Sequence, residues 1–379
     1  MNQTVLLSLF GSSLLLTVPF ISPAVSQKNE QPISEIKTYV VEFKDSVGKS
    51  RIPNVAAQIA RDNGGQLKHT YRNAIKGAAV KIPEARKAKL LKNPNVKRFE
   101  EDRKFTIIAP KKKPIQDSNN SSVPAQETPW GITRVGGTDN GIGKTAWIID
   151  TGIDPNHPDL NVNSQRGFNA FRSGKQGRST DDRNGHGTHV AGTIAAVNND
   201  IGVVGVAAGA TVVPVKVLGS DGSGTTSGVI AGIEHVAANA SVGDVANMSL
   251  GGGVSPILDD AILKAAGKGI QFVLAAGNES DYVNNHSPAR VEGTNIYTVS
   301  AMAKGDKWAY FSNFGNPSID FCAPGVNIKS TWKDGGYHTI SGTSMAAPHV
   351  SGILLLGDIN LDKTVIGDPD GNPDPIAHR

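Results

Sequence analysis

Between residues 146 and 356, short apolar runs alternate with longer stretches of helical periodicity, and this alternation is the strongest constraint on the fold. The apolar runs are typical of buried strands: Ala146–Ile149, Val212–Val217, Val245–Met248, Gln271–Leu274 and Ile296–Val299. The helical stretches are Thr188–Val197, Ser227–Ala240, Pro256–Lys268 and Ser344–Leu356. This alternation predicts a doubly wound parallel α/β sheet. Because such sheets carry their sites at the carboxyl ends of the strands, residues that follow strands are the first candidates for chemistry.

The region before this sheet predicts a second, smaller domain. Its pattern is strand (38–43), helix (54–63), two strands (66–71 and 78–82), helix (84–91) and strand (96–100). This β-α-β-β-α-β order is typical of a small α+β domain with the ferredoxin-like arrangement. A stretch rich in Pro, Ser, Asn and Lys follows at residues 109–129, which indicates an exposed linker open to cleavage.

The first residues of the chain predict export. Residues 5–21 are uncharged and mostly apolar, and small residues follow at 24–26, as in a signal peptide with its cleavage site. The alternative is a membrane anchor, since no Lys or Arg precedes the run. No later apolar run is long enough to span a bilayer, so we expect no membrane association after removal of residues 1–26. The single cysteine, Cys322, permits no intramolecular disulfide.

The formal net charge of +4 conceals two regions of opposite sign. Residues 27–126 carry 21 Lys and Arg against 10 Asp and Glu, and the remainder carries 17 against 24. The two regions should therefore attract each other. Binding to nucleic acid is the alternative use of a basic region, but aromatic residues are sparse here and the charges are scattered through helix and strand patterns. We therefore expect no nucleic-acid partner.

Four polar residues stand at strand ends or helix starts. Asp150 follows the strand at 146–149, His186 and Ser344 open helical stretches, and Asn278 follows the strand at 271–274. Each could simply cap an element, but together they supply the groups for acyl transfer. A serine nucleophile needs a histidine base, a carboxylate that orients the histidine, and an amide donor for the oxyanion.

The motifs that contain these residues resemble those of the subtilisin family of serine proteases. They are "IIDTGID", "GHGTHVAGT", "NMSLGGG", "AAGNE" and "SGTSMAAPHVSG", in the family's order, between about Gln126 and Gly352. The resemblance implies a subtilisin-like fold with Asp150, His186 and Ser344 as the triad and Asn278 as the oxyanion donor. The esterase alternative is disfavoured because the serine does not lie in a G-x-S-x-G sequence.

The preceding domain resembles the family's inhibitor propeptide, with "YVVEFK" and "VKRFEEDRKF". The resemblance implies a self-processing zymogen with a signal peptide (1–26), an inhibitor and chaperone propeptide (27–112), a linker with the processing site (113–124) and a catalytic domain (125–379). The cut is expected most simply near Ala125 or upstream of it. We expect a secreted monomer whose partners are polypeptide substrates and its own propeptide. The alternative is an exported binding module that kept the fold without activity.

The resemblance also implies binding residues. "LGSDGSG" resembles the edge that pairs with extended substrate, and "SLGG" with residues 275–277 resembles the walls of the P1 pocket, which carry no charge and favour neutral or apolar side chains. The substrate-binding residues are then Gly222, Ser223, Gly224, Ser249, Leu250, Gly251, Ala275, Ala276 and Gly277. "HPDL" and "AVNNDIGVVG" resemble the family's tight calcium site, whose Ca²⁺ ligands would be Gln126, Asp159, Asn199 and the carbonyls of Val197, Ile201 and Val203. A solvated Asn/Asp turn is the alternative.

Several features predict ordinary structural roles. His189 is expected to be packed in its helix, and Cys322 to be buried. "DPDGNPD", residues 368–374, has Pro373 where a calcium loop needs glycine, so we expect a solvated tail. The segment after Ser344 is short for this family, and we expect its closing helices to be missing or reduced.

Overall fold

The computed structural model describes residues 35–107, 124–174 and 176–379. The predicted signal peptide and most of the predicted linker lie outside the described residues. Within the described parts of the chain, no helix combines the length and apolar character needed to cross a membrane.

Residues 36–101 form a four-stranded antiparallel sheet with two helices packed on one face. The elements are β1 (Ile36–Phe43), α1 (Ile52–Asp62), β2 (Gln66–Tyr71), β3 (Gly77–Pro83), α2 (Lys87–Lys92) and β4 (Val96–Glu101), in the sheet order β2-β3-β1-β4. This confirms the predicted ferredoxin-like arrangement. Because side chains alternate along a strand, Tyr39 and Val41 of β1 pack with Ile52 of α1, whereas Val40 faces the other side.

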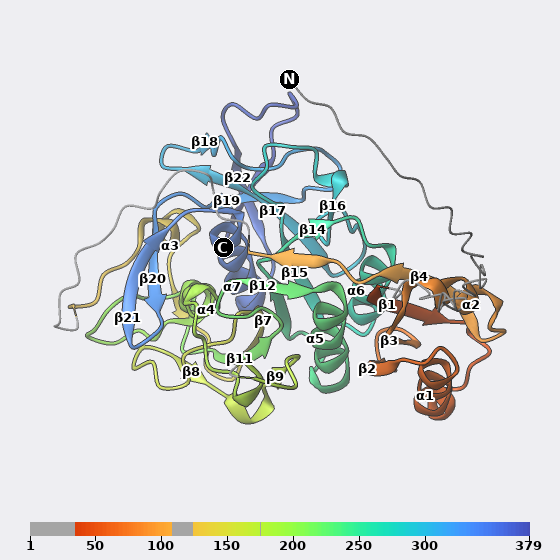
Figure 1. Cartoon of the computed structure of the whole chain (residues 1–379). Coiled ribbons are helices and arrows are strands. Elements are labelled where there is room, and N and C mark those ends of the chain that lie inside the picture. Colours follow the sequence, from red (N-terminus) through yellow and green to blue (C-terminus); the bar gives the residue numbers. More distant parts are fainter. Residues whose placement is uncertain (1–34, 108–123, 175) are drawn as a thin grey trace, which may run out of the picture. The chain divides into compact units, whose positions relative to one another are not determined.

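The main sheet confirms the predicted doubly wound topology (Figure 1). Its strands are β7 (Thr145–Asp150), β8 (Asn161–Val162), β11 (Thr211–Lys216), β13 (Val245–Met248), β15 (Gln271–Ala275), β17 (Ile296–Ala303), β19 (Phe321–Pro324), β22 (Asn360–Thr364) and β23 (Pro375–His378). Their order is β22-β23-β19-β17-β15-β13-β7-β11-β8. The pair β22–β23 is antiparallel, and the other neighbouring pairs in this order are parallel. The chain passes from β7 to β11 on one side and then to β13 on the other. The order of the strands therefore reverses at β7, where such sheets bind ligands.

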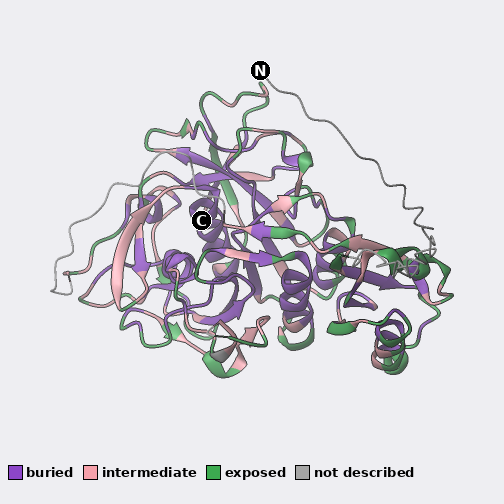
Figure 2. Ribbon diagram, viewed as in Figure 1, coloured by how far each residue is buried: buried purple, intermediate pink, exposed green. Residues whose placement is uncertain are grey.

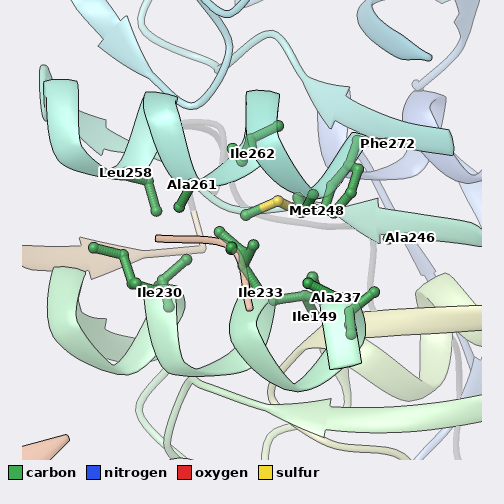
Figure 3. Close-up of a cluster of buried hydrophobic side chains, with 14 of the residues drawn as sticks. Ile149, Ile230, Ile233, Ala237, Ala246, Met248, Leu258, Ala261, Ile262 and Phe272 are labelled. Atoms are coloured by element: carbon green, nitrogen blue, oxygen red, sulfur yellow. The ribbon is translucent and has the colours of Figure 1, made fainter. Parts of the chain in front are cut away.

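Helices cover both faces of this sheet. They are α4 (His186–Ala195), α5 (Thr226–Asn239), α6 (Pro256–Ala266) and α7 (Thr343–Leu356). Ala146 and Ile148 of β7 pack on the face covered by α4 and α7, whereas Trp147 and Ile149 pack with α5 and α6. Figure 3 shows the second of these cores, in which α5 and α6 face each other above the sheet. Its residues are Ile230 and Ile233 of α5, Leu258 and Ile262 of α6, and Met248 and Phe272 of the sheet.

Helix α7 is buried on all sides. Every residue from Thr343 to Leu355 is buried (Figure 2). Most of these residues are apolar or small, as expected for a helix in the centre of a domain. Its first turn is therefore held by the surrounding protein and not by solvent.

The C-terminal segment is a sheet edge and not the expected solvated tail. β22 and β23 form an antiparallel pair, and Ile376 of β23 pairs with Cys322 of β19. This pairing draws Asp374 into the interior, where it is 0% exposed and accepts a hydrogen bond from the Ser300 hydroxyl at 2.5 Å. Burial raises the pKa of Asp374 to about 7. Residues 368–373 stay exposed or half-buried in the turn before β23, as expected, and the prediction is wrong at Asp374 because the acidic composition of this segment said nothing of the strand that follows it.

Candidate active site

The carboxyl end of β7 brings Asp150 into contact with His186. Asp150 is the last residue of β7 and His186 the first of α4. The His186 Nδ1 atom lies 2.9 Å from Asp150 Oδ1 and 3.0 Å from Oδ2. Burial by itself lowers the pKa of His186, but the charge of Asp150, its hydrogen bond and the charge of Asp182 together outweigh burial and raise the pKa above its usual value. Asp150 can therefore fix the ring orientation and stabilise the imidazolium.

A second buried carboxylate, Asp182, holds the start of α4 in place. Its Oδ1 accepts hydrogen bonds from the Thr151 hydroxyl and from the Gly185 N–H, both at 2.9 Å, and its Oδ2 accepts from the Thr188 N–H at 2.9 Å. Because these donors lie on both sides of His186, Asp182 positions the residue that carries the imidazole. The sequence interpretation missed Asp182, and the only available signal was an acidic residue six positions before the predicted helix at Thr188–Val197.

Glycine is required where α4 approaches β7. A Cβ atom on Gly187 would lie 2.1 Å from the carbonyl oxygen of Gly152 and 3.2 Å from Asp150 Oδ1. No larger residue fits there without moving the backbone that joins the aspartate to the histidine.

The predicted nucleophile, Ser344, lies in the first turn of α7 and is 4% exposed. Among the described residues, its hydroxyl donates to the carbonyl oxygen of Ser249 at 3.3 Å, and no hydrogen bond joins it to the His186 ring. The Ser249 hydroxyl in turn donates to the backbone carbonyl of Ser344 at 2.9 Å and accepts from the Asn247 side chain at 2.8 Å. These contacts fix the start of α7 against the end of β13, beside the end of β7.

Asn278 lies against the residues that precede Ser344. Its Oδ1 accepts hydrogen bonds from the Thr343 N–H at 2.8 Å and from the Thr343 hydroxyl at 3.0 Å. Gly342 has a φ of 155°, and a Cβ atom there would lie 3.2 Å from Asn278 Nδ2. The small residues before Ser344 thus let the asparagine amide approach the start of the helix.

A small pocket opens beside Ser344. Its lining residues are Leu250, Ala275, Gly277, Asn278, Thr343 and Ser344, none of which is charged. Four predicted wall residues, Ser249, Gly251, Gly252 and Ala276, are not among the lining residues. Ala276 packs with Val283, Ala289 and Ile319 because it points away from Ala275 along the chain, and Ser249 contacts the backbone of Ser344.

The strand β5 (Lys104–Thr106) occupies the predicted substrate-binding edge. It pairs antiparallel with β12 (Ser223–Thr225), and Figure 1 shows β5 in orange beside β12 in green. On its other side, Thr106 exchanges two backbone hydrogen bonds with Gly251, at 3.1 and 3.2 Å. The chain's own segment thus lies between both edges that were predicted to bind an extended peptide.

Acidic side chains bind N–H and hydroxyl groups across the contact between the N-terminal domain and the main domain. Asp102 accepts from the N–H and hydroxyl of Ser227 near the start of α5, at 2.8 and 2.7 Å. Glu234 of α5 accepts four backbone N–H groups of residues 72–75 at 2.7–2.8 Å. An Arg98–Asp260 ion pair at 2.6 Å follows the expected pairing of a basic with an acidic surface. The opposite net charges of the two domains therefore account for only some of the polar contacts between them.

The side chains of three predicted calcium ligands, Gln126, Asp159 and Asn199, lie close together. Asp159 Oδ1 accepts from Asn199 Nδ2 at 3.0 Å, its Oδ2 accepts from the Val203 N–H at 3.1 Å, and Gln126 Oε1 accepts from the Asn199 N–H at 2.6 Å. Burial raises the pKa of Asp159 to about 6. The described residues hold no group of three or more His, Cys, Asp or Glu side chains suited to a metal. A single buried carboxylate among amide and carbonyl oxygens fits the hard-oxygen preference of calcium, provided that the Asn199 amide turns its oxygen inward.

The other residues considered from sequence have structural surroundings. His189 is fully buried, and its Nε2 lies 3.0 Å from the carbonyl oxygen of Ile328. Burial lowers the pKa of His189 to about 3, so the ring is neutral. Cys322 is buried in the sheet as expected.

Comparison with known proteins supports these assignments at the level of family and fold. A model of the subtilase family matches residues 143–357, and a model of peptidase inhibitor I9 matches residues 38–107. The chain is 40% identical over 302 residues to the alkaline serine exoprotease A of Vibrio alginolyticus, covering 77% of this chain and 53% of that protein. It is 38% identical over 333 residues to the subtilisin-like serine protease AsES of Sarocladium strictum, covering 83% and 78%.

A solved structure confirms the fold. The crystal structure of a cold adapted subtilisin-like serine proteinase aligns with a TM-score of 0.59 and 41% identity, over 66% of this chain and 97% of that chain. The family model includes β7, α4 and α7, which carry Asp150, His186 and Ser344, and the segment after β15 that carries Asn278. The chain belongs to the subtilase family, and an inhibitor I9 domain precedes its subtilase domain.

Proposed function

We propose that this chain is the precursor of a secreted serine endopeptidase that cleaves polypeptides and processes itself. In this proposal residues 1–26 direct export, residues 27–112 inhibit and chaperone the enzyme, and residues 125–379 form the monomeric catalytic domain. The contact between Asp150 and His186 at the carboxyl edge of the sheet, with Ser344 opening α7 nearby, carries the proposal.

The proposed reaction is acyl transfer to Ser344. The hydroxyl turns from the Ser249 carbonyl toward His186, whose Nε2 takes the proton as Oγ attacks the substrate carbonyl carbon. Asp150 holds Nδ1 and stabilises the imidazolium. The amide of Asn278 donates to the developing oxyanion. His186 then protonates the leaving amine, and water releases the acyl group by the same steps in reverse.

The edges and the pocket define the proposed substrate. An extended peptide would add as a strand between β12 and Gly251, as β5 does in this chain. The uncharged pocket with Leu250 and Ala275 favours a neutral or apolar P1 side chain. Because β5 occupies these edges, the propeptide would inhibit by excluding other peptides.

Calcium is proposed as a structural ion. The side chains of Gln126, Asp159 and Asn199 would hold it together with the carbonyls of Val197, Ile201 and Val203. When bound, it would neutralise the buried Asp159 carboxylate and tie residue 126 to the loop at 197–203.

A digest of casein tests the function. The processed wild type should hydrolyse casein, and a serine-directed covalent inhibitor should abolish the activity. Ser344→Ala should remain an unprocessed precursor and lose about six orders of magnitude in kcat. Ser312→Ala, at a buried serine outside the site, is the matched control and should retain activity. A folded wild type that neither processes itself nor digests casein would instead support the inactive binding module.

A further inference from the structure

Thr151, the residue after the proposed triad aspartate, joins separate parts of the site. Its N–H donates to Asp150 Oδ1 at 2.6 Å, and its hydroxyl donates to Asp182 Oδ1 at 2.9 Å. The same hydroxyl accepts the Gly187 N–H at 2.9 Å, and the backbone carbonyl of Thr151 accepts a hydrogen bond from the Lys216 side chain. Every polar atom of Thr151 is therefore bonded, and these bonds tie the ends of β7 and β11 to the start of α4.

Lys216 is a buried lysine beside the triad aspartate. It is the last residue of β11, lies opposite Asp150 in the parallel pairing with β7, and is 1% exposed. A lysine is rarely buried unless opposite charges are close to it. Burial lowers the pKa of Lys216, whereas the charges of Asp182, Asp181 and Asp150 act against burial. Because Asp150 and Asp182 are themselves buried, Lys216 is placed to balance them.

The other titratable groups near His186 are neutral or have other partners. His189 and His349 are fully buried, and burial lowers their pKa values to about 3 and about 4. Four further groups lie near α4: Asp154 with the N–H groups of residues 156 and 335, Asp181 with Arg183 at 3.8 Å, Lys329 with Glu127 at 3.4 Å, and His338 with the Trp332 ring. Among the described residues, the charges bonded to His186 or Thr151 are therefore those of Asp150, Asp182 and Lys216.

We propose that Asp182 and Lys216 are a balanced pair of positioning residues for His186, joined through Thr151. This inference rests on the proposed protease function. At rest, Asp150 and Asp182 give the buried set two negative charges against the one positive charge of Lys216. When His186 takes the serine proton, the set becomes electrically neutral. The second carboxylate therefore favours the imidazolium, and the lysine limits how strongly it does so.

The test is the titration midpoint of the His186 ring, measured by NMR in the full-length Ser344→Ala precursor, which needs no cleavage. The signal that disappears in His186→Gln identifies the ring. Lys216→Met removes a cation and should raise the midpoint, whereas Asp182→Asn removes an anion and should lower it, each by about half a unit to one unit. The double variant should return close to the starting midpoint. In the processed enzyme, the acid limb of kcat/KM should move in the same directions.

Lys268→Met is the matched control. Lys268 also donates to a backbone carbonyl, that of Ala237 at 2.8 Å, but it is exposed and precedes β15 at the opposite edge of the sheet. Its replacement removes the same kind of charge and hydrogen bond, and it should leave the His186 midpoint unchanged.

Denaturant unfolding tests whether the two residues balance each other. Each single variant leaves a buried charge without its counter-charge and should lose stability, and the double variant should lose less than the sum of the two losses. A midpoint that stays or falls in Lys216→Met, or that stays or rises in Asp182→Asn, overturns the inference, as do losses that simply add. If one single variant does not fold, the direction of the shift in the other decides. A wild type that digests no casein overturns the proposed function but leaves the expected midpoints as they are, so the two failures are distinguishable.

Discussion

Replacement of Glu234 by glutamine should detach the propeptide from the catalytic domain without changing the active site. The Glu234 side chain is 6% exposed and lies on α5, where its two carboxylate oxygens accept all four N–H groups of residues 72–75. In Glu234→Gln one oxygen becomes an NH₂ group, so two of the four N–H groups face a donor. Hydrogen bonds to a charged partner contribute about 1.5–3 kcal/mol each, and the loss of two therefore weakens binding by about 3 kcal/mol or more.

This loss corresponds to an increase of about 100-fold in the inhibition constant of the propeptide. The assay adds a peptide of residues 35–107 to the mature wild type or variant and measures the inhibition of peptide hydrolysis. Glu292→Gln makes the same chemical change at an exposed position and should leave the constant unchanged. A change of less than about fivefold in Glu234→Gln would refute the assignment of these four bonds as the main anchor.

Three further predictions follow from the site and its supports. His186 must be neutral to accept a proton, and its pKa is raised above the usual 6.5, so kcat/KM should fall as the pH drops through this raised pKa. A pH profile of kcat/KM measures this, and unchanged activity down to pH 5 would contradict it. Chelation of calcium should lower Tm and speed autolysis, since a ligand at a hundredfold excess over Kd contributes about 2.7 kcal/mol; an identical melting curve in excess chelator would exclude the role of Asp159. Gly187→Ala should lose about 1–3 kcal/mol of stability and most of the activity, because its Cβ would lie 2.1 Å from the Gly152 carbonyl oxygen. Denaturant unfolding measures the stability and active-site titration measures the activity. Wild-type values in both assays would contradict the steric clash between residues 187 and 152.

The periodicity of the sequence was sufficient to predict the architecture. A parallel strand buried on both faces reads as a short apolar run, and the bounds of β13, Val245–Met248, match the predicted run at both ends. Asp150 and Asn278 could be predicted to lie at the same edge of the sheet because the carboxyl ends of its parallel strands share that edge. These are local signals, since strand and helix patterns depend on residues close together in the chain.

The supports of the candidate site could not be predicted in the same way. Asp182 looks like any acidic residue before a helix, and only its burial against the Thr151 hydroxyl shows that it holds α4. Glu234 likewise gains its partners from residues about 160 positions earlier in the chain. The sequence does not show which N–H groups will donate to a given carboxylate, because folding brings these groups to it from distant parts of the chain.

The sequence by itself determined the two domains, the doubly wound parallel topology and the polar residues at the edge of the sheet. Apolar periodicity and small-residue motifs can be read within one or two neighbouring elements of the chain. Only the tertiary structure decided that β5 fills the groove, that residues 124–126 pair with the loop at 200–202, and that Asp374 is drawn inside by β23. Each of these depends on backbone hydrogen bonds, which every residue except proline can donate. The side chains of the sequence therefore do not specify which distant strands will pair.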